Sequence, residues 1–286
     1  MHTINHLTEL REQVREWHHQ GLEVGLVPTM GSLHDGHLAL VREARARSDR
    51  VVVSVFVNPL QFGEGEDYDG YPRTLDEDCR KLLPLSVDAV FAPSVNEVYP
   101  DGVGITTRVQ VAGLSDILCG EFRPGHFAGV ATVVAKLFNM VAPDLAVFGK
   151  KDYQQLTVIR RMVRDLNFPV QVIGVDTVRE ADGLARSSRN AYLQPAERET
   201  AAEIHATLRQ AADWLQAGEW EIEALEQWGR ERLDRKGFRT DYFSIRRQAD
   251  LGRPDAGDRA LVILTAARLG AARLIDNLEV RLNGGG

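Results

Sequence analysis

Two histidines three residues apart, His34 and His37, stand where an apolar helical pattern begins. They belong to the stretch PTMGSLHDGHLALV, residues 28–41, in which Gly31 and Ser32 favour a turn. Residues i and i+3 share one face of a helical turn, so both imidazoles can point to one spot. At a helix N-terminus, backbone N–H groups and the helix dipole favour an anion. The stretch therefore indicates a phosphate-binding turn in which the imidazoles donate hydrogen bonds.

A simpler explanation of the same residues is that His34 caps the helix and His37 is a solvated surface residue. A zinc site built from His34, Asp35 and His37 is less favoured, because nothing nearby completes a tetrahedral set of ligands. A short spacing of this kind is weak evidence on its own, so phosphate binding and capping both stay open.

Two amides follow the next apolar run, in the stretch VNPLQF at residues 57–62. Gln61 offers both a donor and an acceptor to a neutral polar substrate, and Asn58 lies close to it in the chain. Taken alone, the motif favours the simpler explanation that Gln61 is a loop amide that binds only water.

Two lysines, Lys150 and Lys151, follow a later apolar run in the stretch FGKKDYQQ at residues 148–155. Asp152 is placed to cap the helix that follows, and Gln155 is expected on the same helical face. A lysine beside departing phosphates stabilises their charge, whereas a solvated lysine pair at a helix start is common and needs no function.

A fourth cluster, ARSSRN at residues 185–190, sets two hydroxyls between two arginines. Hydroxyl and guanidinium groups together suit phosphate oxygens. A plain polar linker would have the same composition. Arg123 and His126, in the stretch FRPGHF, precede another long helical pattern.

Short apolar runs alternate with amphipathic stretches over most of the chain. The runs predict strands at residues 22–29, 51–59, 87–93, 144–149 and 170–177. The stretches between them predict helices at residues 36–48, 75–83, 129–141 and 153–166. Apolar strands separated by helices are typical of an α/β domain with a parallel sheet covered on both faces. We therefore predict a Rossmann-like, doubly wound parallel sheet in residues 1–176, with the polar clusters at the carboxyl ends of its strands, where such sheets bind ligands.

The pattern of predicted helices and strands changes after residue 176. Two long helical patterns occupy residues 195–236, and three strands are expected at residues 241–248, 259–270 and 272–280. This predicts a second, smaller α+β C-terminal domain in residues 177–286. At the other end of the chain, residues 1–17 have a polar, helical pattern.

The composition narrows the class of protein. A formal net charge of −7 argues against broad contact with nucleic acid, although a local basic pocket for a small anion is compatible with it. The two cysteines, Cys79 and Cys119, form no CxxC motif, so neither a disulfide framework nor a thiolate metal site is expected. No apolar signal region or membrane-spanning run is visible, so we expect a cytoplasmic protein that does not bind membranes.

The ordered set of motifs resembles the pantothenate synthetase (pantoate–β-alanine ligase) family. The motifs are PTMGSLHDGHLALV, FVNPLQF, YPRT, RPGHFAGVATVVAKLF, FGKKDYQQL, DGLARSSRNAYL, DYFSIR and ARLIDN, and together they extend over nearly the whole chain. HDGH is similar to the HxGH signature of a wider nucleotidyltransferase group, and SSRN is similar to that group's second phosphate-binding loop.

The resemblance implies a two-step reaction in which ATP activates pantoate as an adenylate and the amine of β-alanine then displaces AMP. It implies that His34, His37 and Lys151 are catalytic, with His37 as the proton donor. It implies ATP contacts by Met30, Gly31, Ser32, Leu33, His34, Asp35, Gly36, His37, Gly149, Lys150, Lys151, Asp152, Val178, Arg186, Ser187, Ser188 and Arg189. It implies pantoate contacts by Gln61 and Gln155, Mg²⁺ that arrives with ATP and has no dedicated protein site, closure of the C-terminal domain over the site, and a homodimer.

Two residues depart from the family pattern, which is acidic at Lys150 and apolar at Arg186. Both add positive charge near the expected phosphates, and position favours Lys151 over Lys150 as the catalytic lysine. Two other functions stay open beside the ligase: another HxGH-type nucleotidyltransferase, which would keep the nucleotidyl group in its product, and a non-catalytic nucleotide-binding regulator.

Overall fold

The structure is a computed structural model that describes residues 1–63, 68–218 and 221–282. The chain splits into two compact units, which we describe separately. The first unit consists of Met1–Lys150 and Val158–Asp176, and the second of Lys151–Thr157 and Thr177–Gly286. The domain boundary predicted from the sequence assigned residues 151–157 to the first domain. They group with the second unit, where the Asn277 side chain donates to the Lys151 carbonyl and the Tyr153 hydroxyl donates to Glu279, both at 2.9 Å.

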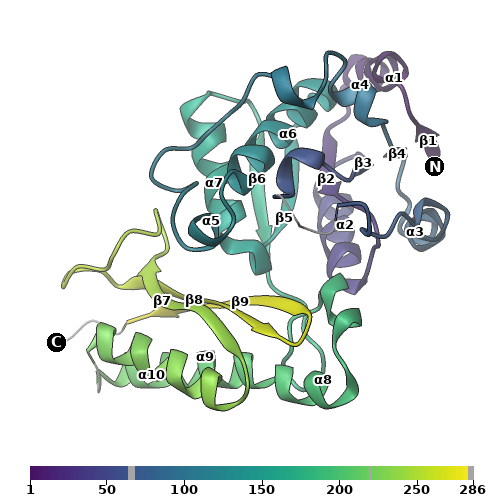
Figure 1. Cartoon of the computed structure of the whole chain (residues 1–286). Helices are drawn as coiled ribbons and strands as arrows, with labels where there is room; N and C mark the ends of the chain where they lie inside the picture. The colour runs from purple at the N-terminus through teal and green to yellow at the C-terminus, as the bar shows by residue number, and fades with distance from the viewer. Residues whose placement is uncertain (64–67, 219–220, 283–286) are drawn as a thin grey trace. The chain divides into compact units, whose positions relative to one another are not determined.

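The first unit is built on a six-stranded sheet in the order β1-β4-β3-β2-β5-β6, in which every pairing is parallel (Figure 1). Its strands are β1 (His2–Ile4), β2 (Val24–Thr29), β3 (Arg50–Val55), β4 (Ala89–Phe91), β5 (Leu145–Gly149) and β6 (Gln171–Val175). This order confirms the predicted doubly wound parallel sheet. The helix expected from residue 1 begins only at Leu7, because residues 2–4 pair with β4 as a short edge strand.

Both faces of this sheet are covered. Val27, Val53 and Val147 form one core with the apolar side of α2, and their alternating neighbours Leu26 and Val52 are fully buried on the opposite face. Helices α1 and α6 pack on each other and against β2, whereas α2 packs against β2, β3 and β5. The helices of the unit are α1 (Leu7–His19), α2 (Asp35–Arg47), α3 (Leu75–Leu82), α4 (Val95–Val98), α5 (Cys119–Phe122), α6 (His126–Val141) and α7 (Tyr153–Asp165), whose first turn belongs to the second unit. Short 3-10 turns are η1 (Pro59–Gln61), η2 (Leu83–Leu85), η3 (Val103–Ile105) and η4 (Lys150–Asp152).

The chain order reverses between the adjacent strands β2 and β5, which makes this the topological switch point of the sheet. The ladder between these strands pairs Gly25 with Leu145 and Leu26 with Ala146 and then stops, although β5 continues to Gly149. Pro28 in β2 has no N–H to offer a neighbouring strand. The two strands therefore end without pairing to each other at their carboxyl ends, which is the place where doubly wound sheets bind ligands.

The second unit contains an antiparallel sheet of β7 (Arg239–Arg247), β8 (Ala260–Leu269) and β9 (Ala272–Arg281), in the order β7-β8-β9. Helices α9 (Glu203–Ala217) and α10 (Ile222–Arg235) pack on this sheet and on each other around a core that includes Leu208, Leu225 and Ile263. The turn η5 (Ser188–Tyr192) and helix α8 (Pro195–Ala201) precede them. Throughout the described residues, the structure contains no helix with the length and apolarity needed to cross a bilayer.

One glycine of α6 sets the position of the η1 turn, which carries Gln61. A Cβ atom added to Gly129 would lie 2.1 Å from the Leu60 carbonyl oxygen and 3.0 Å from the Gln61 nitrogen. Only a residue without a side chain lets the helix approach the backbone of η1 this closely.

We expect Gly129→Ala to lower the free energy of unfolding by about 1–3 kcal/mol, because the added methyl group overlaps the η1 backbone. Urea unfolding measures the change. Gly104→Ala is the matched control, since a Cβ atom there meets nothing within 4 Å, and it should change stability by less than about 0.5 kcal/mol. Equal effects of the two substitutions would contradict the close approach.

Candidate active site

The turn between β2 and α2 is held in an unusual backbone conformation by a buried carboxylate. Gly31 and Ser32 have φ values of +83° and +52°, in the left-handed region. Asp78 of α3 is fully buried and accepts hydrogen bonds from the Ser32 and Leu33 backbone nitrogens at 3.0 and 2.7 Å. The Lys81 ammonium, one turn further along α3, donates to the Leu33 carbonyl at 2.7 Å. Helix α3 thus fixes the backbone immediately before the two histidines.

His34 and His37 cap α2 reciprocally. His34 Nδ1 accepts a hydrogen bond from the Gly36 backbone nitrogen at 3.1 Å, and His37 Nδ1 accepts one from the His34 backbone nitrogen at 3.3 Å. A neutral imidazole has one donor and one acceptor nitrogen, so the N–H of each ring is on Nε2. The ring centroids are 4.1 Å apart. Capping and ligand binding are therefore compatible, because the caps use one nitrogen of each ring and set the other as a donor.

The Gln61 side chain is oriented by a buried amide network beyond β3. Asn58, which is fully buried, donates to Gln61 Oε1 at 2.9 Å and to the Gly129 carbonyl at 3.1 Å. Its own Oδ1 accepts from the Tyr99 hydroxyl at 2.8 Å, and burial raises the pKa of this phenol, which stays a donor. Because the Gln61 oxygen is an acceptor within the network, its amide nitrogen is the group set as a donor.

Arg123 and His126 hold the backbone of the same turn. His126 Nδ1 lies 2.8 Å from the Gln61 carbonyl oxygen, and Arg123 Nη2 donates to that oxygen at 3.2 Å. Arg123 Nη1 is 3.1 Å from His126 Nε2. With Nδ1 as the donor to the carbonyl, Nε2 is the acceptor for the arginine. The FRPGHF motif thus positions Gln61 through its main chain.

The end of β5 brings Gly149 and Lys150 to the same sheet edge as the turns after β2 and β3, since β2 lies between β3 and β5. Lys150 forms an ion pair with Asp176 Oδ1 at 2.8 Å. Its ammonium group therefore has an acidic partner inside the first unit.

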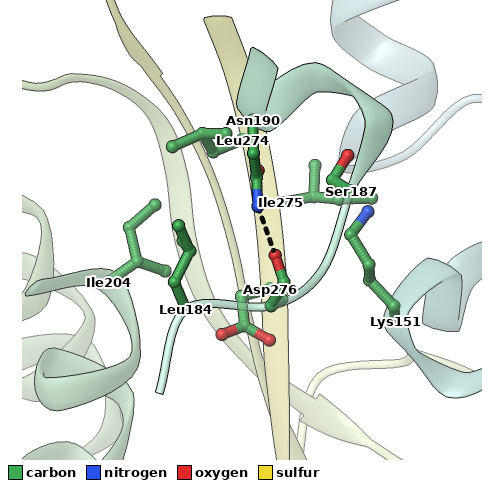
Figure 2. Close-up of a pocket in the computed structure, with 9 residues that line it drawn as sticks. Lys151, Leu184, Ser187, Asn190, Ile204, Leu274, Ile275 and Asp276 are labelled. Carbon is green, nitrogen blue, oxygen red and sulfur yellow. Dashed lines mark hydrogen bonds between the residues drawn. The ribbon is translucent and has the colours of Figure 1, made fainter. Parts of the chain in front are cut away.

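In the second unit, Lys151 and Ser187 line one small pocket together with Asn190 and Asp276 (Figure 2). Ser187 caps η5 by accepting a hydrogen bond from the Arg189 backbone nitrogen at 3.2 Å. Asn190 closes the turn by donating to the Ala185 carbonyl at 3.1 Å. Figure 2 shows the Lys151 nitrogen on the same side of the pocket as the Ser187 hydroxyl. The structure therefore brings together a lysine and a hydroxyl that are 36 positions apart in the sequence.

The remaining predicted residues of the second unit flank this pocket in the chain. Val178 accepts a backbone hydrogen bond from Arg186 at 2.9 Å, and the Arg186 guanidinium lies 3.2 Å from the Glu180 carboxylate. Asp152 ends η4, and Gln155 lies in the first turn of α7. Arg186, like Lys150, has an acidic neighbour.

A buried ion pair lies beneath this loop. Arg179 binds both oxygens of Asp276, at 2.7 and 2.9 Å, and Asp276 is only 4% exposed. His205 Nδ1 is 3.9 Å from the same carboxylate. Burial lowers the pKa of His205, the Arg179 charge lowers it further, and the Asp276 charge opposes the shift.

The structure thus orders the predicted residues in two groups, one in each unit. Met30–His37, Gln61, Gly149 and Lys150 surround the switch point of the large sheet, and Lys151, Asp152, Gln155, Val178 and Arg186–Arg189 belong to the second unit. Among the residues that orient them, the sequence indicated no role for Asp78, Lys81, Arg179, Asp276 and Asn277. Asp78 lies in LDEDCRKLL, where acidic side chains at a helix start indicate only a solvated N-terminus.

Comparison with known proteins decides the family. The family model described as pantoate-beta-alanine ligase matches residues 2–279. The chain belongs to this family. It is 55% identical over 283 residues to the pantothenate synthetase of Alkalilimnicola ehrlichii, with 99% of both chains covered. It is 54% identical over 283 residues to that of Pseudomonas aeruginosa, with 99% of this chain and 100% of the relative covered.

Solved structures of the family have the same fold. The pantothenate synthetase of Thermus thermophilus gives a TM-score of 0.91 at 50% identity, with 98% of this chain and 100% of that chain covered. The pantoate-beta-alanine ligase of Francisella tularensis, whose crystal structure is a complex with beta-gamma ATP and beta-alanine, gives a TM-score of 0.81 at 34% identity, with 97% of both chains covered.

The backbone conformation of the turn after β2 depends on hydrogen bonds to the Asp78 carboxylate. We expect Asp78→Asn to raise the KM for ATP and lower kcat/KM about 10- to 100-fold, because an amide presents a donor to backbone N–H groups that need an acceptor. Steady-state kinetics with ATP varied measures the effect. Asp76→Asn, on the same helix, should leave kcat/KM within about twofold. An Asp78→Asn enzyme with unchanged ATP kinetics would contradict this role.

Proposed function

We propose that this chain condenses pantoate with β-alanine to form pantothenate, converting ATP to AMP and pyrophosphate through a pantoyl-adenylate intermediate. The observation that carries the proposal is the reciprocal cap of His34 and His37 beside the switch point of a doubly wound sheet, in a chain that matches the ligase family over residues 2–279. The reaction belongs to pantothenate and coenzyme A biosynthesis.

In the first step, a carboxylate oxygen of pantoate attacks the α-phosphorus of ATP. A bond forms between that oxygen and phosphorus, and the bond to the β-phosphate oxygen breaks and releases pyrophosphate. The carboxylate is ionised at neutral pH, so the step needs alignment and charge stabilisation and no general base. We assign the stabilisation to the Nε2–H groups of His34 and His37, the N-terminus of α2 and the Lys151 ammonium.

We propose that the remaining ATP contacts come from both groups of residues. We assign them to Met30–Gly36 and Gly149–Lys150 in the first unit, and to Asp152, Val178 and Arg186–Arg189 in the second. The Ser187 turn supplies hydroxyl and backbone N–H donors for phosphate oxygens, as Lys151 supplies charge.

Pantoate is assigned to Gln61 and Gln155. Neutral amides hold a carboxylate without the bidentate charge pairing that an arginine would give, and so without stabilising the ground state strongly. Support comes from the Asn58 network, which uses the Gln61 oxygen and sets its nitrogen as the donor to pantoate.

In the second step, the neutral amine of β-alanine attacks the activated carbonyl carbon. The new C–N bond forms as the bond between that carbon and the AMP oxygen breaks, AMP leaves as a phosphate anion, and the amine nitrogen releases its proton to water. The resemblance gives His37 as the family's proton donor, and we assign its Nε2–H as a hydrogen-bond donor to the phosphate oxygens of the adenylate, because Nδ1 accepts the cap.

We propose that Mg²⁺ enters with ATP. The residues assigned to the phosphates are imidazoles, a lysine and serines, which suit phosphate oxygens, whereas Mg²⁺ prefers carboxylates, phosphates and water. When bound to the triphosphate, the ion neutralises the charge of the departing pyrophosphate. We further propose a cytoplasmic homodimer, and sedimentation of the purified protein tests the oligomeric state directly.

The direct test of the function supplies ATP, pantoate and β-alanine to the purified protein. Equal amounts of AMP, pyrophosphate and pantothenate are expected. A nucleotidyltransferase of another kind would keep the nucleotidyl group in its product, and a regulator would bind ATP without releasing pyrophosphate when pantoate is added. Either result would refute the proposal.

Alanine substitutions of the two adjacent lysines should differ sharply in their effect on the rate of adenylate formation. Lys151→Ala is expected to lower the rate of adenylate formation by about 10²- to 10³-fold, because charge stabilisation of the leaving group is lost. Lys150→Ala should cost at most a few-fold, since this lysine is paired with Asp176. Pyrophosphate release from ATP and pantoate measures both. A larger loss with Lys150→Ala would reverse the assignment.

Substitutions that add a charge at Gln61 test whether the neutrality of its amide matters for adenylate formation. We expect Gln61→Arg to bind pantoate and to form the adenylate about tenfold more slowly or worse, because the guanidinium stabilises the ground-state carboxylate. Gln61→Met, which removes the amide without adding charge, separates this effect from loss of the donor. If Gln61→Arg forms the adenylate at the wild-type rate, the explanation is wrong.

A further inference from the structure

Two consecutive polar residues of β9, Asp276 and Asn277, are buried although β9 is an edge strand of its sheet. They belong to the ARLIDN motif, for which the proposed reaction has no role. Buried polar side chains are retained at a cost unless they are fully hydrogen-bonded. Their partners therefore indicate what the two residues do.

Asn277 holds the main chain of Lys151. Its Nδ2 donates to the Lys151 carbonyl oxygen at 2.9 Å. This bond ties the 3-10 turn η4, which precedes α7, to a strand that lies more than 120 positions further along the sequence. A lysine side chain is long and flexible, so the position of its Cα atom determines which region its ammonium can reach.

Asp276 holds the loop that ends in Ser187. Its carboxylate binds Arg179 at 2.7 and 2.9 Å, and Arg179 also donates to the Gly183 carbonyl at 3.0 Å. Arg179 pairs with Ala185 in an isolated antiparallel bridge, and the Ala185 carbonyl accepts the bond from Asn190 that closes the Ser187 turn. An unbroken series of bonds thus leads from Asp276 to the phosphate-binding turn.

The two anchors are joined at Asn277. Its backbone nitrogen donates to Asp276 Oδ1 at 2.8 Å, and its backbone carbonyl accepts from Arg179 Nη2 at 3.3 Å. Lys151, Ser187 and Asp276 line the same pocket (Figure 2). The Asp276 charge is matched by the bidentate guanidinium, so the anchor places little net negative charge beside a phosphate site.

We infer that Asp276 and Asn277 are positioning residues, which fix the backbone of Lys151 and the Ser187–Arg189 turn to one strand so that both reach the same phosphates. The inference rests on the proposed function, because it assigns a purpose to the geometry of the residues given to ATP there. It goes further in naming the pair of residues that sets this geometry without touching substrate.

The test measures pyrophosphate release from ATP and pantoate by the full-length chain. We expect Asn277→Ala, and the isosteric Asn277→Asp, to lower the rate about 10- to 100-fold, because a misplaced catalytic group is costly even when it is present. Asp276→Asn should raise the KM for ATP and leave the KM for pantoate within about twofold.

The matched control is Gln248→Ala. Gln248 makes the same kind of bond in the same unit, from its Nε2 to the Leu261 carbonyl at 2.8 Å. Its removal should shift the melting temperature about as much as Asn277→Ala and leave the rate within about twofold. A similar rate for Gln248→Ala and Asn277→Ala would overturn the inference.

A double-mutant cycle distinguishes positioning from general stability. In a Lys151→Ala background, single-turnover measurements should find that Asn277→Ala costs less than about threefold, because the side chain that it positions is gone. The same fold-loss in both backgrounds would overturn the inference while leaving the proposed function intact. A wild-type chain that releases no pyrophosphate would overturn both.

Discussion

The early end of the ladder between β2 and β5 is the constraint on which the first unit's chemistry depends. The chain leaves β2 and β5 toward opposite edges of the sheet at this switch point, and here pairing also stops at Leu26 and Ala146. The turn after β2 can then carry Gly31 and Ser32 in left-handed conformations. Asp78 offsets that strain with two charge-assisted hydrogen bonds.

Both units share one feature. The groups proposed to bind substrate are held by hydrogen bonds from neighbouring residues that are not themselves proposed to bind it. The backbone before the histidines is held by α3, the Gln61 amide by Asn58 and its carbonyl by His126. Phosphoryl-group chemistry needs alignment more than covalent participation. This explains why much of the polar network in the chain lies behind the proposed site.

The fold was largely predictable from the sequence, because buried parallel strands such as VVVSVF have no polar face and read as continuous apolar runs. The three-residue strand β1 was missed since it is too short to have a period. Among the proposed site residues, the HDGH and SSRN clusters were selected by residue type and stay predictions. Asp78 was not, because three acidic residues occupy one helix turn and only tertiary packing buries one of them. Likewise, the capping role of His34 and its proposed phosphate-binding role are indistinguishable by spacing, and the structure makes them compatible because the cap uses only one ring nitrogen.

The outer edge of β9 has a consequence beyond catalysis. An edge strand offers unpaired peptide groups with which a strand of a second molecule can pair, and repeated pairing of this kind produces fibrils. At Asn277 both peptide groups are already occupied, one by a carboxylate and one by a guanidinium that this carboxylate clamps. An added strand would have to displace a bidentate ion pair at this position, so the arrangement disfavours edge-to-edge pairing at Asn277.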